Sequence, residues 1–236
     1  MYKILVKFTK KDRLKFISHL ELMKVIERAL RRANIPLKFT QGFNPHPIIS
    51  FASPLPVGVS SEGEYLTLEV TEEINLKKFI IELNEQLPHG IEFIKAKYID
   101  VKSKSLMSLV EYGLYAVKCK TLKTYTVQEV ENILNNFLLK KEILYNKIGK
   151  RKKVKKVNIR EEIREIIVLA VEDKNVYLKM TLATGSRGNL KPEIVVEKLV
   201  EMEKMQIDLE KTRVHRLQLF ALSEDERLIL LDNIIK

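Results

Sequence analysis

Residues 18–34, SHLELMKVIERALRRAN, carry the signals of one complete helix and set the organisation of the first half of the chain. Ser18 and Glu21 are spaced as a capping box, in which each side chain accepts the backbone N–H of the other residue. Asn34 favours the left-handed conformation that ends a helix, and Pro36 prevents the helix from restarting. The apolar residues at helical spacing predict one buried stripe, made of Leu22, Met23, Ile26, Ala29, Leu30 and Ala33.

Extended segments flank this helix. YKILVKFT at residues 2–9 and EYLTLEV at residues 64–70 alternate apolar and polar side chains, as half-buried strands do. The remaining elements predicted here are a strand that begins at 36–40 and resumes at 48–52, a helix at 76–87 and a strand at 91–99. The order is that of a ferredoxin-like β-α-β-β-α-β unit, an antiparallel sheet with two helices on one face.

The second half repeats this theme. The predicted elements are a strand at 109–120, a capped helix at 126–139, a strand at 143–148, a hairpin of strands at 163–171 and 176–183, a helix from Pro192 to Met205, a strand at 213–222 and a short helix after Ser223. The predicted fold class is therefore α+β, with tandem ferredoxin-like modules and antiparallel sheets. The modules are expected at 1–104 and 105–236, joined through residues 101–108.

Composition limits the possible classes of protein. The chain has 236 residues, of which 45% are hydrophobic, enough for one large or two smaller cores. Cys119 is its single cysteine, so an internal disulfide and a cysteine-coordinated cluster are excluded within this sequence. No apolar run approaches the about 18 residues of a membrane span, and the first residues do not resemble a signal peptide. A soluble, cytoplasmic protein with no membrane contact, metal or cofactor is expected.

Positive charge is concentrated in two segments. Residues 1–40 hold 11 basic and 3 acidic residues, and residues 101–156 hold 14 and 4. Residues 41–100 and 157–236 are both acidic on balance, although the whole chain has a net charge of +11. A lysine-rich background would spread the charge evenly. Clustering of this kind is typical of a protein that binds a polyanion such as RNA.

The helix of residues 19–33 and the following loop, residues 39–58, offer groups suited to RNA. Arginine forks on the polar side of the helix match phosphate oxygens. In the loop, an aromatic ring can stack on a base, and amide and imidazole groups can hydrogen-bond its edge. The alternative is a solvated helix face beside a rigid turn. The predicted nucleic-acid-binding residues here are Arg28, Arg31, Arg32, Phe43, Asn44 and His46.

Two further segments are candidates. KIGKRKKVKK, residues 147–156, has seven basic residues and no acidic one, and it is predicted as the tip of a hairpin or a mobile loop. Its predicted phosphate contacts are Lys150, Arg151, Lys152 and Lys153, which would not read sequence. GSRGNLKPE, residues 185–193, places Arg187 just before a helix start, where backbone N–H groups can hold an anion. It matches no phosphate-binding loop motif.

Catalysis has a weaker basis in the sequence. His19 begins its helix, where the helix dipole favours a neutral imidazole, and with His46 it would supply the acid and base for RNA cleavage. The alternative is that His19 only covers the helix end. The sequence contains no GxSxG, HExxH, Walker or CxxxCxxC motif. No catalytic residue is therefore assigned.

Several motifs resemble a known family. SHLEL at 18–22, QGFNPHP at 41–47, VNIREEI at 157–163 and LATGSRGNLKPEIVVEKL at 182–199 are similar to the radical SAM-linked bacterial family of unknown function. Family members occur alone or as extensions of radical SAM proteins, so the resemblance implies a radical SAM enzyme as partner. Ile48 stands where the family often has lysine, which removes one positive charge from the loop.

Three functions remain open on this evidence. The first is a non-catalytic module that binds tRNA or rRNA and presents it to a radical SAM enzyme. The second is a protein-interaction module whose basic faces dock an acidic partner, and the third is a stand-alone RNA-processing enzyme that uses His19 and His46. RNA binding is expected to weaken steeply with salt, which separates it from the second function.

Overall fold

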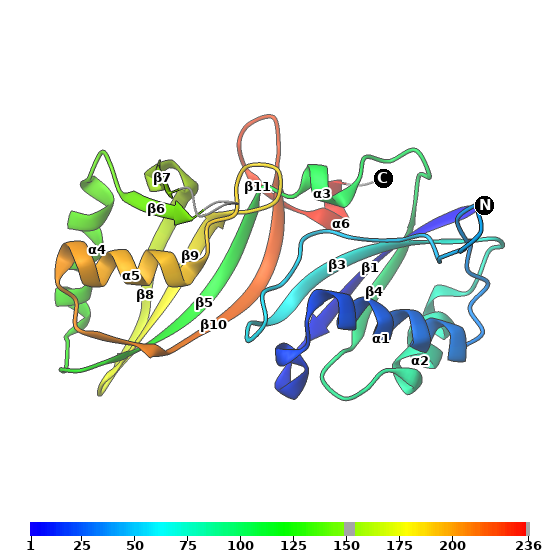
Figure 1. Ribbon diagram of the computed structural model, residues 1–236, viewed down its shortest axis with the longest axis horizontal. Coiled ribbons are helices and arrows are strands. Elements are labelled where there is room, and N and C mark those ends of the chain that lie inside the picture. The colour runs from blue at the N-terminus through cyan, green and yellow to red at the C-terminus, as the bar shows by residue number, and fades with distance from the viewer. Residues whose placement is uncertain (149–153, 235–236) are drawn as a thin grey trace. The chain divides into compact units, whose positions relative to one another are not determined.

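The protein is described by a computed structural model that covers residues 1–148 and 154–234 (Figure 1). It is a mixed α+β protein with a large sheet in which antiparallel pairing dominates. Within the described ranges, no helix is both long and apolar enough to cross a membrane.

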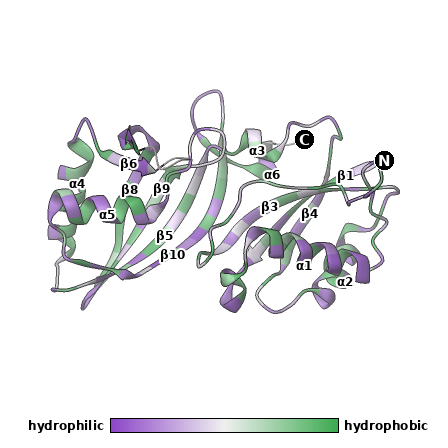
Figure 2. Cartoon of the chain, viewed as in Figure 1, coloured by the Kyte–Doolittle hydropathy of each residue, from purple (hydrophilic) through white to green (hydrophobic). Residues whose placement is uncertain are grey.

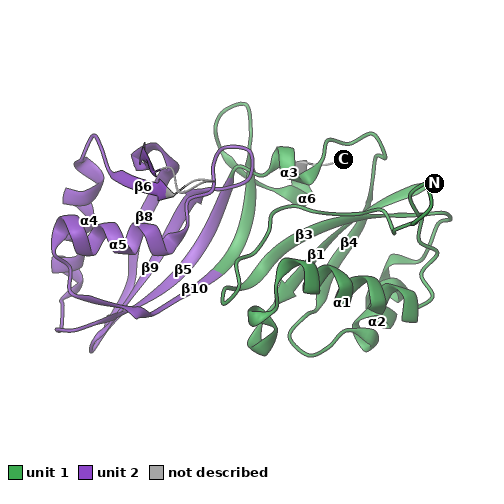
Figure 3. Ribbon diagram, viewed as in Figure 1, with its two compact units in different colours: residues 1–111, 216–236 green, residues 112–215 purple. Residues whose placement is uncertain are grey.

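The chain forms two compact units, which Figure 3 colours separately. Unit 1 comprises residues 1–111 and 216–236, and unit 2 comprises residues 112–215. Strand β10 (Ile207–Leu222) contributes to both, because its residues up to His215 belong to unit 2 and its later residues belong to unit 1. The units therefore differ from the consecutive ranges that the sequence predicts, since the end of the chain returns to the first unit.

Unit 1 is built on antiparallel strands in the order β4-β1-β3. β3 pairs near its end with β2, where Ile49 lies opposite Leu68, and its beginning lies beside β10. The elements of unit 1 are β1 (Tyr2–Lys10), the 3-10 helix η1 (Asp12–Phe16), α1 (His19–Arg32), β2 (Ile49–Phe51), β3 (Ser60–Val70), α2 (Leu76–Gln86), β4 (Phe93–Ile99), α3 (Leu106–Leu109), the second part of β10, β11 (Leu228–Leu230) and α6 (Leu231–Ile234).

Helix α1 begins and ends where the sequence predicts. The Ser18 hydroxyl accepts the Glu21 N–H at 3.2 Å, and the Glu21 carboxylate accepts the Ser18 N–H at 2.7 Å. Asn34 has a left-handed φ of 52°. The predicted capping box and stop signal are therefore confirmed.

Both faces of the unit 1 sheet are covered. On one face, Val6 of β1 and Leu68 of β3 belong to a core that includes residues of α1 and α2, which lie over this face in Figure 1. On the other, Leu5 of β1 packs in a second core with Leu106 of α3 and Leu231 of α6. Figure 2 shows the resulting alternation of hydrophobic and hydrophilic residues along these elements.

Unit 2 has strands in the order β10-β5-β9-β8, in which β9 pairs antiparallel with both β5 and β8, together with a separate β6-β7 hairpin. Its helices α4 and α5 lie on one side of these strands in Figure 1. The elements are β5 (Tyr112–Thr121), α4 (Val127–Leu139), β6 (Leu144–Ile148), β7 (Val154–Asn158), the 3-10 helix η3 (Arg160–Glu162), β8 (Ile163–Glu172), β9 (Asn175–Ala183), α5 (Pro192–Glu203) and the first part of β10.

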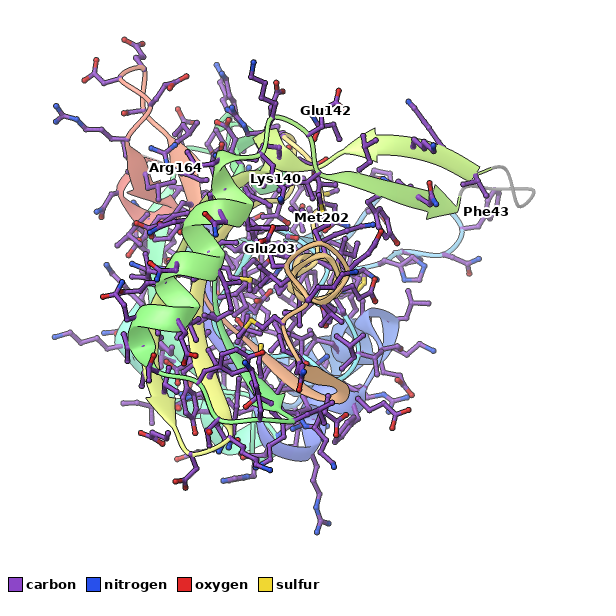
Figure 4. The ribbon with its side chains drawn as sticks, turned by 90° about the vertical axis from the view of Figure 1, so that its left-hand side faces the viewer. Phe43, Lys140, Glu142, Arg164, Met202 and Glu203 are labelled. Atoms are coloured by element: carbon purple, nitrogen blue, oxygen red, sulfur yellow. The ribbon has the colours of Figure 1, made fainter. Side chains whose placement is uncertain are left out.

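The covered side of unit 2 contains the chain's single thiol. Cys119 lies opposite Val176 in the β5-β9 pair, and both residues are fully buried. Burial raises the pKa of the Cys119 thiol to about 12. At the ends of the two helices, Lys140 forms an ion pair with Glu203 at 3.0 Å, and Figure 4 labels both residues.

Some elements differ from the sequence prediction. β10 starts at Ile207 instead of residue 213, and the segment expected as a linker contains α3. The predicted strand entry at 36–40 makes only isolated bridges, because the chain turns there into a short hairpin. The tail forms β11 before its short helix.

Candidate nucleic-acid interface

The segment between α1 and β2 is a narrow hairpin. Phe39 is bridged to Pro47, and the Ile48 N–H donates to the Lys38 carbonyl at 2.9 Å. Nearer the tip, the Thr40 N–H donates to the His46 carbonyl at 2.9 Å, and the His46 N–H donates to the Thr40 hydroxyl at 3.0 Å. These four contacts fix the stem, so that residues 41–45 form its tip. We call residues 38–48 the NPHP hairpin.

The tip of the NPHP hairpin projects into solvent. Phe43 has a relative exposure of 106%, and Figure 4 shows it at the end of its loop. Asn44 and His46 are also exposed, whereas Pro47 is buried at the base. Gly42 has a φ of +125°, a conformation that suits glycine and turns the chain just before Phe43. The exposed side chains are therefore presented on a stem restrained by hydrogen bonds.

The arginines of α1 lie in different environments. Arg31 stacks over the Phe39 ring at 5.0 Å and forms an ion pair with Glu27 at 2.8 Å. Arg32 donates to the Gln86 carbonyl at 2.5 Å, while Arg28 is exposed one turn before Arg31. Helix and hairpin thus meet, as the sequence predicts, through Arg31 and Phe39.

The two histidines lie at opposite ends of α1. His19 is the first helical residue, and its ring meets the Phe51 ring edge-on at 5.1 Å. Arg31, which contacts the hairpin stem that carries His46, lies 12 positions later, or about 18 Å along the helix axis. The structure therefore does not bring the proposed acid–base pair together.

A buried charged cluster, which sequence reasoning missed, lies near His19. Arg216 donates from Nε and one terminal nitrogen to the two Glu64 oxygens at 2.7 and 2.6 Å, and the two side chains are only 1% and 4% exposed. Arg216 also reaches the Ser53 carbonyl at 3.5 Å. Fully buried Lys10 donates to the Ile17 carbonyl at 2.8 Å, just before α1 begins. We call Lys10, Glu64 and Arg216 the buried ion cluster.

The pKa values of Lys10 and of neighbouring His19 are both lowered. Burial lowers the pKa of Lys10, with Glu64 opposing and Arg216 adding to this effect. Burial also lowers the pKa of His19, an effect that Glu64 opposes and Lys10 reinforces. The alternation of side chains along a strand could have indicated this cluster. Lys10 is an even number of positions from Val6, and Glu64 is an even number of positions from Leu66. Both charged side chains therefore fall on the same face of the strand as a core residue.

In unit 2, Arg187 lies in the loop before α5 and shares an aromatic neighbour with a second arginine. Its guanidinium lies 5.2 Å from the centre of the Tyr112 ring, and that of Arg164 lies 5.3 Å from the same centre. The loop that carries Arg187 is closed by the Leu190 N–H, which donates to the Ala183 carbonyl at 3.0 Å. Arg164 and Tyr112 were not predicted as neighbours of this loop.

The basic run is flanked by paired strands. β6 pairs with β7, so that Lys147 lies opposite Lys155 and Asn146 opposite Lys156. These three lysines are exposed, and the pairing agrees with a hairpin. The predicted phosphate contacts, Lys150, Arg151, Lys152 and Lys153, lie outside the described residues.

Solved structures with a similar fold exist. A chain in the crystal structure of a Cbf5-Nop10-Gar1 complex matches with a TM-score of 0.53 and 12% identity, and the match covers 97% of this chain and 52% of that one. A chain in the structure of an H/ACA RNP bound to a substrate RNA containing 2'-deoxyuridine matches with a TM-score of 0.48, 10% identity and coverage of 92% and 47%. The protein thus spans about half the length of the solved chains it matches.

At such identities the first match shows a shared fold alone. Among curated proteins, none matches this sequence. A family model described as an uncharacterized protein conserved in bacteria (DUF2344) matches residues 3–192. Because that match covers most of its length, the chain belongs to this bacterial family.

Proposed function

We propose that this protein is a non-catalytic RNA-binding module. The observation that carries the proposal is Phe43, a fully exposed aromatic ring at the tip of the NPHP hairpin. An exposed apolar side chain is common on protein surfaces, but this one stands on a hydrogen-bonded stem that contacts a basic helix. Base stacking on such a ring contributes about 1–3 kcal/mol.

The roles of the remaining residues follow from their positions. Asn44 in the tip and His46 next to it offer hydrogen bonds to a base edge, and Arg28 offers phosphate contact from the exposed side of α1. Pro45 and Pro47 restrict the residues before them, so that ordering the tip on RNA costs less conformational entropy. The expected ligand is a structured RNA with an accessible base, such as tRNA or rRNA.

A radical SAM enzyme is the proposed recipient of the bound RNA. The support is the family resemblance in the SHLEL and QGFNPHP motifs. The sequence has one cysteine, and Cys119 is buried, so the three cysteines of a radical SAM cluster would lie outside this sequence. The module would hold RNA while the partner performs the chemistry.

We also infer that the two units are two ferredoxin-like modules. The support is that both have the same order of strands and helices and equivalent sheet orders, β4-β1-β3-β2 in unit 1 and β10-β5-β9-β8 in unit 2. The β6-β7 hairpin is then an insertion in the second module. On this assignment β10 is the last strand of the second module, and its later residues add to the sheet of the first.

A protein-interaction module is the second candidate. Phe16 in η1 and Leu20 in α1 are 62% and 69% exposed, and the Lys15 ammonium lies 5.1 Å from the centre of the Phe16 ring. An apolar patch with a basic neighbour suits an acidic partner that carries apolar side chains.

RNA titration of matched variants tests the proposal. Phe43→Ala is expected to weaken binding of a labelled tRNA about tenfold, which lies within the range for one stacked base. Ile81→Ala, which truncates another strongly exposed apolar residue of unit 1, is the control and is expected to change little. Both melting temperatures are expected to remain unchanged. Equal affinities for the two variants would contradict the proposal, as would binding that is insensitive to salt.

A further inference from the structure

The sheet of unit 2 has two chemically different faces. Along β5, Tyr115, Val117 and Cys119 are buried on the side of the helices. Lys118 and Lys120 alternate with them and point to the opposite side, where Lys118 is exposed and Lys120 is half-buried. We call this opposite side the lysine face.

The neighbouring strands extend the lysine face. Tyr177 and Lys179 of β9 lie opposite Lys118 and Ala116, respectively. In β8, Ile167 lies opposite Lys179 and is 38% exposed. Leu169 lies in the register shift just before Ala170, the residue opposite Tyr177, and is 53% exposed. The face therefore combines ammonium groups, an aromatic ring and apolar side chains across three adjacent strands.

Cationic groups lie near both ends of the lysine face, and the acidic residues Glu165 and Glu172 lie along its β8 edge. The Lys118 ammonium lies 5.4 Å from the centre of the Tyr177 ring, and Lys179 forms an ion pair with Glu165 at 3.2 Å. At the other end, Arg164 and Arg187 lie over Tyr112, which is on the same side of β5 as Lys118. The seven residues from Tyr112 to Lys118 span about 20 Å of strand, the length of a few nucleotides.

We propose that the lysine face binds a single-stranded segment of RNA, an inference that rests on the proposed function because RNA is its ligand. Unpaired bases can lie flat on a sheet and stack on Tyr177, while Ile167 and Leu169 cover their apolar surfaces. Ammonium groups along β5 and β9 neutralise the phosphates. Duplex RNA presents no free base faces along its sides and would gain only the phosphate contacts.

Charge-matched variants test this assignment in the full chain. Lys118→Gln/Lys120→Gln removes two charges from the lysine face, and Lys141→Gln/Lys204→Gln removes two exposed charges after α4 and α5. The probe is a labelled oligouridine of about 12 nucleotides, titrated between about 50 and 200 mM salt. The face variant is expected to bind roughly tenfold more weakly, with a salt slope flatter by about 0.7 for each lost phosphate contact, whereas the control stays near the unaltered protein.

An aromatic pair of variants adds a test of stacking. Tyr177→Ala is expected to weaken oligouridine binding, and Tyr177→Phe is expected to retain it, because the ring and not the hydroxyl supports the base. Neither change is expected to weaken binding of a duplex of equal length. Ultraviolet crosslinking of oligouridine is expected to label peptides of β5 and β9.

The possible failures can be told apart. If the unaltered protein binds neither tRNA nor oligouridine, both this inference and the proposed function are wrong. If tRNA binding depends on Phe43 while the two double-lysine variants bind oligouridine equally, only the lysine face is wrong. Preferential displacement of the oligouridine by polyglutamate would identify an acidic protein as occupant, and a β8-dependent dimer in light scattering would identify a second copy. Either result overturns the assignment.

Discussion

The two units use a similar order of strands and helices in different ways. Unit 1 buries both faces of its sheet and places the buried ion cluster at core-facing positions. Unit 2 buries one face and leaves lysines, a tyrosine and apolar side chains on the other. The comparison indicates that the order of the strands does not decide the role of a sheet face. A face that other elements cover contributes to stability, whereas an uncovered face is available to a ligand.

The largest effect is expected when the two units are produced as separate fragments of the chain. Residues 112–215 include a complete set of strands for unit 2, so this fragment is expected to unfold cooperatively by itself. Residues 1–104 lack Leu219, Ala221 and Leu231, which pack against Leu5 and Tyr65, and they are expected to unfold without a cooperative transition. Thermal melts followed by circular dichroism measure both. A cooperative melt of 1–104 would support the module boundaries predicted from the sequence.

Breaking the buried ion cluster should have the next largest effect. Arg216→Met leaves the Glu64 carboxylate buried without its main partner, which costs about 3–5 kcal/mol of unfolding free energy. Urea unfolding measures the loss. Arg213→Met, in an exposed position of the same strand, is the control and is expected to stay within about 0.5 kcal/mol of the unaltered protein.

At position 216, the stability should depend on neutralisation of the Glu64 carboxylate and not on the arginine side chain itself. Glu64→Leu/Arg216→Met removes both charges and is expected to recover most of the lost stability, because apolar pairs often replace a buried ion pair without loss. A double variant as unstable as Arg216→Met would show that the packing of Arg216, and not the unpaired carboxylate, caused the loss.

The smallest expected effect is a pH dependence confined to unit 1. Burial lowers the pKa of His19, opposed by Glu64 and reinforced by Lys10, so the unfolded chain binds a proton at higher pH than the folded chain does. The resulting stability is present above the ordinary histidine pKa, about 6.5, and is lost as the pH falls through the lowered value.

His19→Gln is therefore expected to flatten the dependence of the unfolding free energy on pH below about 6.5. His46→Gln, at an exposed position, is the matched control. Urea unfolding at a series of pH values measures both. Identical pH profiles for His19→Gln and the unaltered protein would remove His19 as the source.

Local chemistry allowed much of the fold to be predicted. Ser18 with Glu21 forms the predicted capping box, the predicted capped helix at 126–139 begins with a second box of Thr126 and Glu129, and Asn34 ends α1 as expected. These signals act over three or four residues and can be read directly. The return of β10 to unit 1 could not be predicted in this way, because its pairing with β3 joins residues about 150 positions apart and depends on no local pattern.

The candidate sites show the same difference between local contacts, which could be predicted, and long-range contacts, which could not. The NPHP hairpin and its contact with α1 involve neighbouring segments, and their proximity was predicted. The partnership of Glu64 with Arg216 was missed, although the parity of Glu64 placed it at a core-facing position. The lysine face needed the register of three strands, since Lys118, Tyr177 and Ile167 are adjacent only after folding.

Cys119 gives the protein a practical property. Its thiol is fully buried, and a pKa of about 12 leaves almost no thiolate at neutral pH, so alkylating reagents should not react with the folded chain. A cysteine placed at an exposed position of the hairpin tip, as in Gln41→Cys, would then be the single reactive site for a fluorophore or a crosslinker. The native sequence is thus already suited to site-specific labelling, and a probe at the hairpin tip would report RNA docking without removal of the natural thiol.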